Sequence, residues 1–554
     1  MKQRPLRMLP KRVLITAALP YANGPLHFGH IAGCYLPADV HARFQRMLGV
    51  KTAFISGSDE YGVAITLSAE QEGRSPQEHV DIYHKINQKL FEQLNISFDH
   101  YSRTTTPIHT KTAQEFFLTL HKNGYIEEKE TEQLFSEADN RFLADRYVIG
   151  TCPRCKYPEA RGDECTSCGA SYEATDLIDP RSKISNAPLI LKKTTHWFMR
   201  FDKFKDQLQE WIKDKPWKNN VLKFAQHYID NLQPRAITRD SEWGIPVPLE
   251  HAKGKVLYVW FDAPIGYISM TKEWSPEHWK DFWLDLDTKL INFVGKDNIP
   301  FHAIFFPAML MGTNELYKLV DDLPANEFLQ LEGRQFSKSA NWTIDLNRFF
   351  QNFTADQIRY VLAANAPESQ DSEFTWIDFK NRCNSELVGK LGNFANRSLT
   401  FLNRQLEGTA PKATLSQEDE TFLSQCHDLL SQIKDSYTHY HLRKASQLLM
   451  ELAQTGNVYF DHKQPWKDKQ SDATKATLYC CLECLKCLAI AAYPIMPVAA
   501  QGLWKLLGFT SEMTIWDQPP FPPGQKLPEP SVLFQKVDDD LIASEIEKLH
   551  LFLN

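Results

Sequence analysis

The chain has 554 residues, 43% of them hydrophobic and 24% charged, which is ordinary for a globular protein of two to four domains. Its 62 Lys and Arg residues against 69 Asp and Glu residues give a net charge of −7, so a nucleic-acid partner would have to meet a locally basic surface. No apolar run approaches the length that spans a bilayer, which argues against a membrane protein.

The N-terminal segment partly resembles a targeting presequence. It contains no acidic residue before Asp39 and leads into a short apolar stretch. Its basic residues are Lys2, Arg4, Arg7, Lys11 and Arg12. Because the apolar stretch continues directly into a histidine pair, cleavage would remove the first strand of the site proposed below. We therefore expect the segment to be retained and the protein to be cytoplasmic.

Strands and helices alternate in the first hundred residues. The apolar run 13–18 (Val-Leu-Ile-Thr-Ala-Ala) predicts a buried parallel strand, and 53–56 predicts a second. Helices are predicted over 27–48 and 76–94, the second with Pro76 in its first turn. This alternation is typical of an α/β fold with a Rossmann-type parallel sheet.

The alternation breaks over residues 117–235, where charged and glycine-rich segments surround a cysteine cluster. This region is interpreted as an insertion that splits the sheet. Strands are predicted to return at 256–260 and 291–294, and a helix at 305–311 leads to a further strand near 328–330.

From about residue 380 onward, apolar residues recur at helical spacing, as at Leu387, Leu391, Phe394 and Leu402. This predicts an all-α helical bundle, which a helix at about 538–551 closes. The predicted division is 1–116 for the first Rossmann half, 117–235 for the connective insertion, 236–330 for the second Rossmann half, 331–385 for a signature-loop and stem-contact region, and 386–554 for the bundle with its C-terminal tail.

Four of the eleven cysteines form two C-x-x-C pairs, separated by nine residues. They are Cys152, Cys155, Cys165 and Cys168. Paired knuckles of this kind present four thiolates to a tetrahedral Zn²⁺ and leave no position for water, so we expect one structural zinc. Disulfides or coincidence are the alternative, but the other cysteines follow no paired framework, which favours a reducing compartment.

A second group of cysteines is not expected to bind metal. Cys480, Cys481, Cys484 and Cys487 alternate with leucines at spacings of three and four. This pattern is typical of the buried face of a helix, where free thiols pack well.

A histidine pair and a distant lysine form a candidate phosphate site. Residues 27–30 (His-Phe-Gly-His) follow the first strand and a small-residue turn at 20–25, so a helix N-terminus would offer its N–H groups and positive dipole end to a phosphate. The loop 335–339 (Gln-Phe-Ser-Lys-Ser) would add a mobile cation. Each motif alone is a weak signal, because a lone lysine between serines is usually a surface loop.

In this order and at this separation, the two motifs resemble the HIGH and KMSKS signatures of class I aminoacyl-tRNA synthetases. Further segments resemble the methionyl-tRNA synthetase family in particular. They are 18–24 (Ala-Leu-Pro-Tyr-Ala-Asn-Gly), 259–267 (Val-Trp-Phe-Asp-Ala-Pro-Ile-Gly-Tyr), 295–297 (Gly-Lys-Asp) with 301–302 (Phe-His), the four-cysteine insertion, 393–397 (Asn-Phe-Ala-Asn-Arg) and 464–466 (Gln-Pro-Trp). The resemblance covers nearly the whole chain. The chain departs from the family at Gln335, where the usual motif has lysine, and at Phe336, where it has methionine.

The resemblance implies a methionine site at the end of the second strand, where Asp59 would pair with the α-ammonium group. The other residues implied are Leu19, Tyr21, Trp260, Ala263, Pro264, Tyr267, Phe301 and His302. Aromatic walls and one donor suit a polarizable, weakly accepting thioether. Core packing is the alternative for Trp260 and Tyr267 taken singly, but their position around a Pro-Ile-Gly turn at a strand end favours the pocket.

The resemblance also implies an ATP site and an anticodon site. The residues for ATP are His27, Gly29, His30, Gly295, Asp297 and Lys338, of which His27, His30 and Lys338 would be catalytic. Asn393, Arg397 and Trp466 would read the anticodon by stacking and edge hydrogen bonds, although packing is the ordinary role of such a tryptophan. Lys380, Arg382, Lys390 and Arg404 are candidate phosphate contacts, or simply solvated helix charges.

The implied activity is that of a methionine–tRNA ligase, which forms methionyl-adenylate from L-methionine and ATP and transfers methionine to the 3′ end of tRNA(Met). Mg²⁺ is expected on the phosphates. The insertion is too small for both a zinc lobe and a large editing domain, which argues against the leucine, isoleucine and valine enzymes. The alternatives are another class I synthetase, such as the cysteine enzyme, or a non-catalytic RNA-binding protein with a synthetase fold. Because no domain follows the bundle, we expect a monomer.

Overall fold

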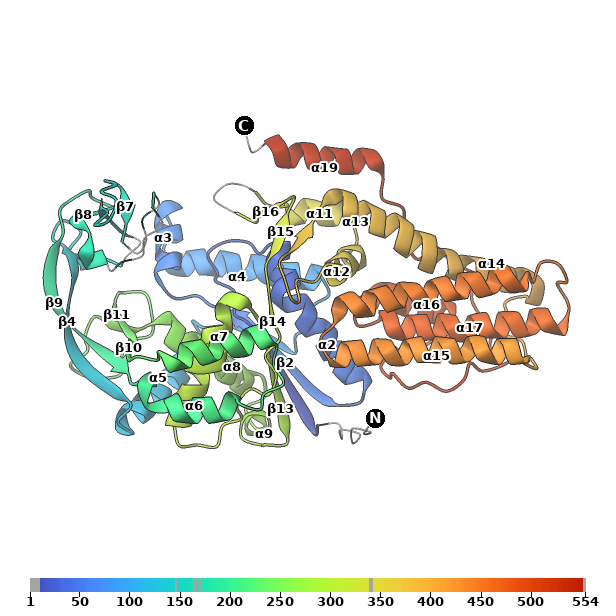
Figure 1. Ribbon diagram of the computed structural model, residues 1–554, viewed down its shortest axis with the longest axis horizontal. Coiled ribbons are helices and arrows are strands. Elements are labelled where there is room, and N and C mark those ends of the chain that lie inside the picture. The colour runs from blue at the N-terminus through green and yellow to red at the C-terminus, as the bar shows by residue number, and fades with distance from the viewer. Residues whose placement is uncertain are drawn as a thin grey trace.

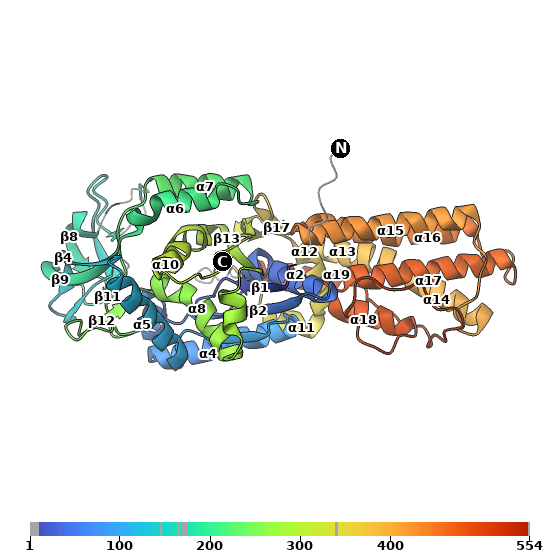
Figure 2. The same ribbon diagram turned by 90° about the horizontal axis from the view of Figure 1, so that it is seen from below.

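The computed structural model describes residues 10–144, 147–162, 165, 167–168, 172, 174–337 and 342–551. The molecule is elongated, with a parallel sheet in the middle, the insertion at one end and the helical bundle at the other (Figure 1, Figure 2). Among the described helices, none has both the length and the apolar character needed to cross a lipid bilayer. The predicted five-part division of the chain stays a prediction.

A parallel sheet forms the centre of the molecule, and its strands follow the order β14-β13-β1-β2-β3. These strands are β1 (Arg12–Ala17), β2 (Lys51–Ser58), β3 (His100–Arg103), β13 (Thr288–Gly295) and β14 (Ala325–Asn326). Ile15 on β1 is paired with Phe54 on β2 and with Ile291 on β13. Successive residues of β1 point to opposite faces, so two hydrophobic cores sandwich the sheet. The predicted α/β class and its split sheet are confirmed.

The helices of the first half begin where the sequence indicates. A continuous helical segment follows the first strand, built from α1 (Phe28–His30), the π-type turn η1 (Ile31–Tyr35) and α2 (Leu36–Met47). α3 (Val63–Gln71) is short, while α4 (Pro76–Gln93) begins with a capping box between Ser75 and Glu78. α5 (Pro107–Lys122) then leads into the insertion.

The insertion consists of small antiparallel sheets and two helices. Its larger sheet pairs β4 (Ile126–Ser136) with β9 (Ile190–Met199), flanked by β5 (Arg141–Phe142) and β10 (Arg235–Ala236). A second sheet carries the cysteine lobe and contains β6 (Val148–Thr151), β7 (Ala160–Arg161) and β8 (Ile178–Ser182). The helices are α6 (Lys205–Ile212) and α7 (Asn219–Asp230). The broken strand–helix pattern over 117–235 reflects this change of architecture.

One predicted strand is wrong. Residues 256–260 were expected to rejoin the parallel sheet, but β12 (Lys255–Leu257) pairs antiparallel with β11 (Thr238–Asp240) in a separate small sheet, and helix α8 (Val259–Trp274) begins at Val259. Most of α8 is buried, so it has no polar face that would show a helical period in the sequence. The run Val-Leu-Tyr-Val-Trp therefore reads as a strand.

The second half adds short elements around the sheet. They are α9 (Trp279–Trp283), η5 (Lys296–Asn298), η6 (Phe301–Phe305), α10 (Phe306–Gly312), and a separate small sheet of β15 (Leu329–Leu331), β16 (Arg334–Gln335) and β17 (Ser372–Phe374). The strand predicted near 328–330 therefore exists, but it lies outside the parallel sheet.

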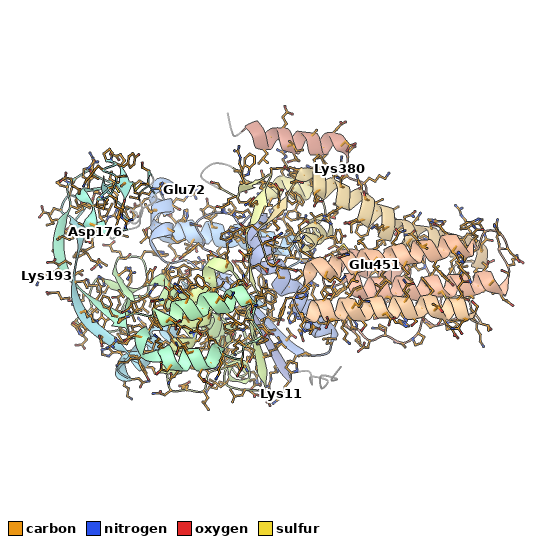
Figure 3. The ribbon with its side chains drawn as sticks, in the orientation of Figure 1. Lys11, Glu72, Asp176, Lys193, Lys380 and Glu451 are labelled. Carbon is orange, nitrogen blue, oxygen red and sulfur yellow. The ribbon has the colours of Figure 1, made fainter. Side chains whose placement is uncertain are left out.

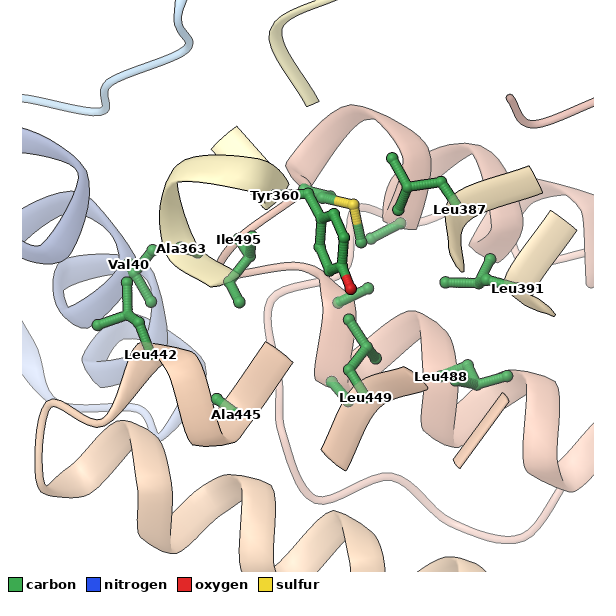
Figure 4. Packing of buried hydrophobic residues seen from close by; sticks show 14 of the residues in the cluster. Val40, Tyr360, Ala363, Leu387, Leu391, Leu442, Ala445, Leu449, Leu488 and Ile495 are labelled. Carbon is green, nitrogen blue, oxygen red and sulfur yellow. The ribbon is translucent and has the colours of Figure 1, made fainter. Parts of the chain in front are cut away.

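Helices make up the C-terminal part, as predicted. They are α11 (Leu346–Asn352), α12 (Ala355–Ala364), α13 (Trp376–Arg382), η7 (Cys383–Gly392), α14 (Asn393–Leu406), α15 (Gln417–Thr438), α16 (Leu442–Lys463), α17 (Asp472–Ala492), α18 (Pro497–Leu506) and α19 (Asp539–Leu551). One core runs unbroken from the sheet into the bundle. Figure 4 shows this joint, where Val40 of α2 lies beside Leu442 of α16 and Tyr360 of α12 points toward Leu449 of α16.

Candidate functional site

The carboxyl ends of the central strands gather the residues predicted to bind methionine and ATP. β1, β2 and β13 are parallel neighbours, so the segments that follow them emerge at the same edge of the sheet. Leu19 follows β1, Asp59 follows β2, and Asp297 follows β13. The chain order reverses between β1 and β13, and such a switch point is where open α/β sheets form their ligand crevice.

Asp59 is a buried carboxylate at this edge. Its backbone N–H donates to the carbonyl of Pro20 at 2.8 Å, and its carbonyl accepts from the N–H of Ala22 at 2.9 Å. These two hydrogen bonds connect the segment after β2 to the segment after β1. The side chain is only 2% exposed, and its Oδ1 has no hydrogen-bond partner within the described part of the chain. Burial raises the pKa of Asp59 well above its usual value, and nearby Asp262 raises this pKa further. A buried carboxyl with one oxygen left without a hydrogen bond is suited to a cationic ligand.

Aromatic side chains form a pocket beside Asp59. Trp260 and Phe301 stack with their ring centroids 3.7 Å apart, and Tyr21 meets Trp260 edge-on at 6.0 Å. The cavity holds about 20 Å³ and is lined by Leu19, Asp59, Trp260, Ala263, Pro264, Tyr267, Asn298, Phe301 and His302. The predicted pocket residues are thus brought together. They do not flank a turn, however, because Trp260 and Tyr267 both lie within helix α8.

Two side chains fix the polar end of this pocket. His302 is buried, and burial lowers its pKa to about 4, so the ring is neutral at pH 7. Its Nδ1 lies 3.0 Å from the carbonyl of Asn298, which can only accept, so Nδ1 carries the proton. Nε2 therefore accepts a hydrogen bond from the hydroxyl of Tyr267 at 2.8 Å. Asn298 was missed by the sequence analysis, although it precedes His302 by one helical turn.

A second buried pair lies behind the pocket and was also missed. The ring of His109 lies 3.3 Å from Asp262 through Nε2 and 2.9 Å from the Ser269 hydroxyl through Nδ1. That hydroxyl donates to the carbonyl of Gly266 at 3.0 Å, so it accepts from His109. Burial lowers the pKa of His109 to about 3 and raises that of Asp262 well above its usual value. The pair therefore shares one proton. These two residues are 153 positions apart, so no sequence motif could indicate that they are in contact.

The two signature motifs are in contact. His27 caps α1, where its Nδ1 accepts from the N–H of Gly29 at 3.1 Å and its own N–H donates to His30 Nδ1 at 3.2 Å. The ring of Phe336 stacks on His27 at 4.5 Å with an interplanar angle of 4°. A Cβ on Gly29 would lie 2.9 Å from the His27 ring and 3.3 Å from Phe336. The absence of a side chain at Gly29 therefore lets the His27 and Phe336 rings pack closely against the backbone. Lys338 lies outside the described residues.

The predicted ribose contacts follow β13. Gly295 is its last residue, and a Cβ at this position would lie 2.7 Å from Oδ1 of Asp297. Lys296, between them, is turned away into ion pairs with Glu327 at 2.8 Å and Asp371 at 3.0 Å. The carboxylate of Asp297 is thereby left at the sheet edge without that cation. Gln335, the departure from the lysine of the signature, is exposed at the end of β16.

The four cysteines of the insertion converge on one point. Their Sγ atoms all lie within 4.8 Å of one another, with Cys152 3.9 Å from Cys168 and Cys155 3.6 Å from Cys165. The backbone N–H groups of Arg154 and Cys155 point at Cys152 Sγ, 3.4 Å away. This donor set fits a tetrahedral metal site. The second group of cysteines lies buried along α17, and this confirms the predicted buried helix face.

The predicted anticodon residues meet at the tip of the bundle. The Asn393 side chain donates to Asn457 Oδ1 at 3.1 Å, which ties α14 to α16. Arg397 pairs with Asp461 at 2.5 Å and lies over the Phe460 ring at 5.1 Å. Trp466 is 40% exposed, with its ring 5.9 Å from Phe460. This surface offers an exposed aromatic face, a guanidinium and an amide.

Two of the candidate phosphate contacts are paired within the protein. Lys380 lies on α13, where Figure 3 labels it, and pairs with Asp539 of α19 at 2.6 Å. Arg382 pairs with Asp378 at 2.8 Å and with Glu386 at 3.3 Å. These partly exposed ion pairs favour the interpretation of both as ordinary helix charges rather than phosphate contacts.

Known proteins resemble this chain over nearly its full length. The family described as tRNA synthetases class I (M) matches residues 13–399, and the anticodon-binding domain of tRNA ligase matches residues 419–549. The chain is 58% identical to the methionine–tRNA ligase of Protochlamydia amoebophila, over 98% of this chain and 80% of that protein, and 52% identical to that of Chlamydia abortus, over 90% and 92%. The solved Mycobacterium tuberculosis methionyl-tRNA synthetase in complex with methionyl-adenylate superposes with a TM-score of 0.78 at 26% identity, over 95% of this chain and 99% of that one.

Proposed function

This chain belongs to the class I tRNA synthetases, and we infer that it is an enzyme that activates L-methionine with ATP and attaches it to tRNA. The observation that carries this conclusion is the crevice at the β1–β13 switch point. There a buried carboxyl, whose Oδ1 has no hydrogen-bond partner in the described part of the chain, and an aromatic pocket share one edge of the sheet with the histidine-capped helix. The alternatives, another class I enzyme or a non-catalytic RNA-binding protein, have no comparable support.

Methionine would occupy the aromatic pocket with its ammonium group on Asp59. The side chain would lie among the residues predicted for it, namely Leu19, Tyr21, Trp260, Ala263, Pro264, Tyr267, Phe301 and His302. Because His302 already accepts the Tyr267 hydroxyl proton, this network holds the hydroxyl at the polar end of the pocket. The Tyr267 proton is thereby committed to His302, so Tyr267 would face the thioether without donating to it.

ATP would lie across the sheet edge, held by His27, Gly29, His30, Gly295, Asp297 and Lys338. The stack between His27 and Phe336 supports this arrangement, because it brings the chain two residues before Lys338 to the phosphate-binding helix. The methionine carboxylate attacks the α-phosphorus in line, and pyrophosphate leaves. Positioning and charge stabilisation by His27, His30 and Lys338 would supply the acceleration. Mg²⁺, when bound to the phosphates, would neutralise part of their charge.

The four-cysteine cluster would hold one structural Zn²⁺. Four cysteine ligands would fill its tetrahedral coordination, so no coordination position would be left for a catalytic water or substrate. The tip of the bundle, with Asn393, Arg397 and Trp466, would read the anticodon of tRNA(Met). We further propose a monomer that works in the cytoplasm. The cysteines support a reducing compartment, because no disulfide joins any of them in the described part of the chain.

The test is amino-acid-dependent pyrophosphate exchange. Purified protein with ATP should exchange labelled pyrophosphate when methionine is added and not when leucine or isoleucine is added. Lys338→Ala should reduce the rate strongly. Equal exchange with leucine would reject the substrate assignment, and exchange unaffected by Lys338→Ala would reject the role of the signature lysine.

A further inference from the structure

A histidine behind the methionine pocket contacts a second buried carboxyl beside Asp59. His109, in the first turn of α5, and Asp262, in the first turn of α8, are both 0% exposed. Nε2 of His109 lies 3.3 Å from Oδ2 of Asp262. Burying an acid and an imidazole is costly unless each is hydrogen-bonded. Neither side chain takes part in the proposed contacts to methionine or ATP, so the pair needs another explanation.

The segment that carries Asp59 packs on the start of α8. A Cβ on Gly62 would lie 3.3 Å from Cγ1 of Val259, which begins that helix. Asp59 and Ala263, the residue after Asp262, line the same small cavity. Burial, and after it the charge of Asp262, raises the pKa of Asp59 well above its usual value. Two buried carboxyls in this relation do not both ionise easily, so one of them keeps a proton.

The hydrogen bonds of His109 favour the proton on Asp262. The Ser269 hydroxyl donates to the carbonyl of Gly266 at 3.0 Å, so it accepts from the Nδ1–H of His109 at 2.9 Å. Nε2 then carries a lone pair and can only accept. Burial lowers the pKa of His109 to about 3, which keeps the ring neutral at pH 7. Asp262 is thus offered an acceptor for an O–H group, which stabilises its neutral form.

Asp59 has the opposite surroundings. The backbone N–H of Tyr61 hydrogen-bonds to its carboxyl and acts against burial, because a donor favours the ionised form. Its Oδ1 has no partner in the described part of the chain, which leaves that atom for an ammonium group. The other titratable groups around the two carboxyls are Glu60 with its partner Arg103, the hydroxyls of Tyr61 and Tyr267, and His302.

We propose that His109 is a positioning residue for methionine activation, which keeps a proton on Asp262 and so leaves Asp59 as the charged carboxyl that receives the α-ammonium group. The proposal rests on the proposed function and adds to it the residue that sets the charge of the amino-acid site. Without the acceptor at Nε2, the proton would pass more often to Asp59, and a neutral Asp59 cannot form the ion pair. His109 acts through the two carboxyls and touches neither substrate.

Pyrophosphate exchange at several pH values tests this role in the full-length protein. His109→Leu keeps a buried apolar side chain but removes the acceptor. The KM for methionine should rise roughly 5- to 100-fold at pH 7, the effect of one buried hydrogen bond, while kcat at saturating methionine stays unchanged. The pH below which KM rises should move upward. His109→Gln can still accept from Asp262 and donate to Ser269, so it should restore most of the loss.

Asp262→Asn should shift the pH profile the other way. It removes the repulsion that raises the pKa of Asp59, so the pH below which KM rises should move downward. A role confined to packing would not give two opposite shifts. Glu60, whose pKa burial raises to about 7, is present in every variant and cannot produce a difference between them.

His41→Leu is the matched control for loss of a buried imidazole. His41 is 2% exposed and donates through Nδ1 to the carbonyl of Tyr437 at 3.2 Å, at the joint with the bundle. Its loss should lower the unfolding midpoint and leave the pH profile of KM as in the unmodified protein. A profile shifted by this variant as far as by His109→Leu would show that the effect is general destabilisation and would overturn the proposal.

Infrared difference spectra report the proton itself and need no substrate. The spectrum of the unmodified protein minus that of Asp262→Asn at pH 7 should show the C=O band of a protonated carboxyl. Absence of this band would overturn the proposal, as would pH profiles of His109→Leu and Asp262→Asn that move together or not at all. If the unmodified protein fails to exchange with methionine, the proposed function is wrong, and the infrared band still decides whether Asp262 holds the proton.

Discussion

At the scale of single residues, Asp59 is placed so that its ligand decides its charge. Burial and the neighbouring Asp262 raise the pKa of the empty site, whereas an ammonium group at Oδ1 would favour the carboxylate. Binding of methionine through Asp59, as proposed, would therefore require this carboxyl to lose its proton. Because the pKa of Asp59 is raised, its carboxyl becomes protonated at a higher pH than an ordinary aspartate does.

This gives a prediction of pH dependence. The KM for methionine in exchange should rise as the pH falls through the raised pKa of Asp59, a window that begins above its usual value of 3.8. The neutral form cannot pair with the ammonium group, so affinity is lost on the acidic side and recovered on the basic side.

Asp59→Asn is the matched control for this pH effect. It should weaken methionine binding about 10- to 100-fold at neutral pH, the value of a charge-assisted hydrogen bond, and it should remove the pH dependence. Calorimetric titration at several pH values measures both. An unmodified protein whose methionine affinity stays flat until the pH reaches the usual aspartate pKa of 3.8 would contradict the assignment.

At the scale of elements, the cysteine lobe has little core of its own. Cys152 and Cys165 are themselves buried in its small cluster, together with Val148, Ala160 and Leu177. A sheet of this size needs a cross-link or a metal to stay folded.

Cys165→Ser should therefore lose the metal and unfold this lobe. Metal content is expected to fall from one zinc per chain towards none, and limited proteolysis should cut between β6 and β8. Cys487→Ala, in the buried stripe of α17, is the control that should keep the metal. Full zinc content and protease resistance in the Cys165 variant would show that the cluster is not the metal site.

The packing of α14 on α16 depends on one glycine. A Cβ on Gly456 would lie 2.5 Å from the ring of Phe394, next to Asn393. Gly456→Ala should cost about 1–3 kcal/mol of the free energy of unfolding through overpacking and should raise the KM for tRNA. Gly33→Ala, where a Cβ meets nothing within 4 Å, should be neutral or slightly stabilising. Chemical denaturation compares the two, and equal unfolding midpoints would contradict the packing argument.

The sequence predicted elements well where local signals agree. Pro76 in the first turn places the start of α4 correctly, and the apolar run of β1 predicts a buried strand. α8 failed because a helix that is buried almost all round shows no period, and its Pro264 and Gly266 look like a turn. Motif residues around Asp59 could be named in advance, but Asn298 and the His109–Asp262 pair could not. Their role follows from contacts made only in the folded chain.

At the scale of the whole molecule, one arginine joins the catalytic sheet to the bundle. Arg359 is fully buried and pairs with Asp39 of α2 at 2.6 Å. It also donates to the carbonyls of Leu94 at 3.0 Å, Pro494 at 2.9 Å and Ile495 at 2.6 Å. Burial opposes the charge of Asp39, but Arg43 and Arg359 hold its pKa down to about 2. The ion pair thus stabilises the fold above the usual aspartate pKa and is lost as the pH falls from about 4 towards 2.

Arg359→Met should destabilise the protein by about 3–5 kcal/mol, because it leaves Asp39 buried with one cation fewer. Aminoacylation should suffer more than exchange, since the bundle loses its fixed position relative to the sheet. Arg382→Met, whose ion pairs with Asp378 and Glu386 are partly exposed, is the control and should cost less than about 1 kcal/mol. Unfolding midpoints at pH 7 measure the difference, and similar losses for both variants would contradict the role of the buried pair.

The split sheet also has a consequence during synthesis. β1 needs β13 on its open side, and β13 leaves the ribosome only after the whole insertion has been made. At about 5–20 residues per second, the first strand waits roughly fifteen seconds to a minute with an unpaired apolar edge. Nascent chains stalled before β13 should therefore depend on chaperones, and the enzyme that charges tRNA would itself be most exposed to aggregation when translation slows.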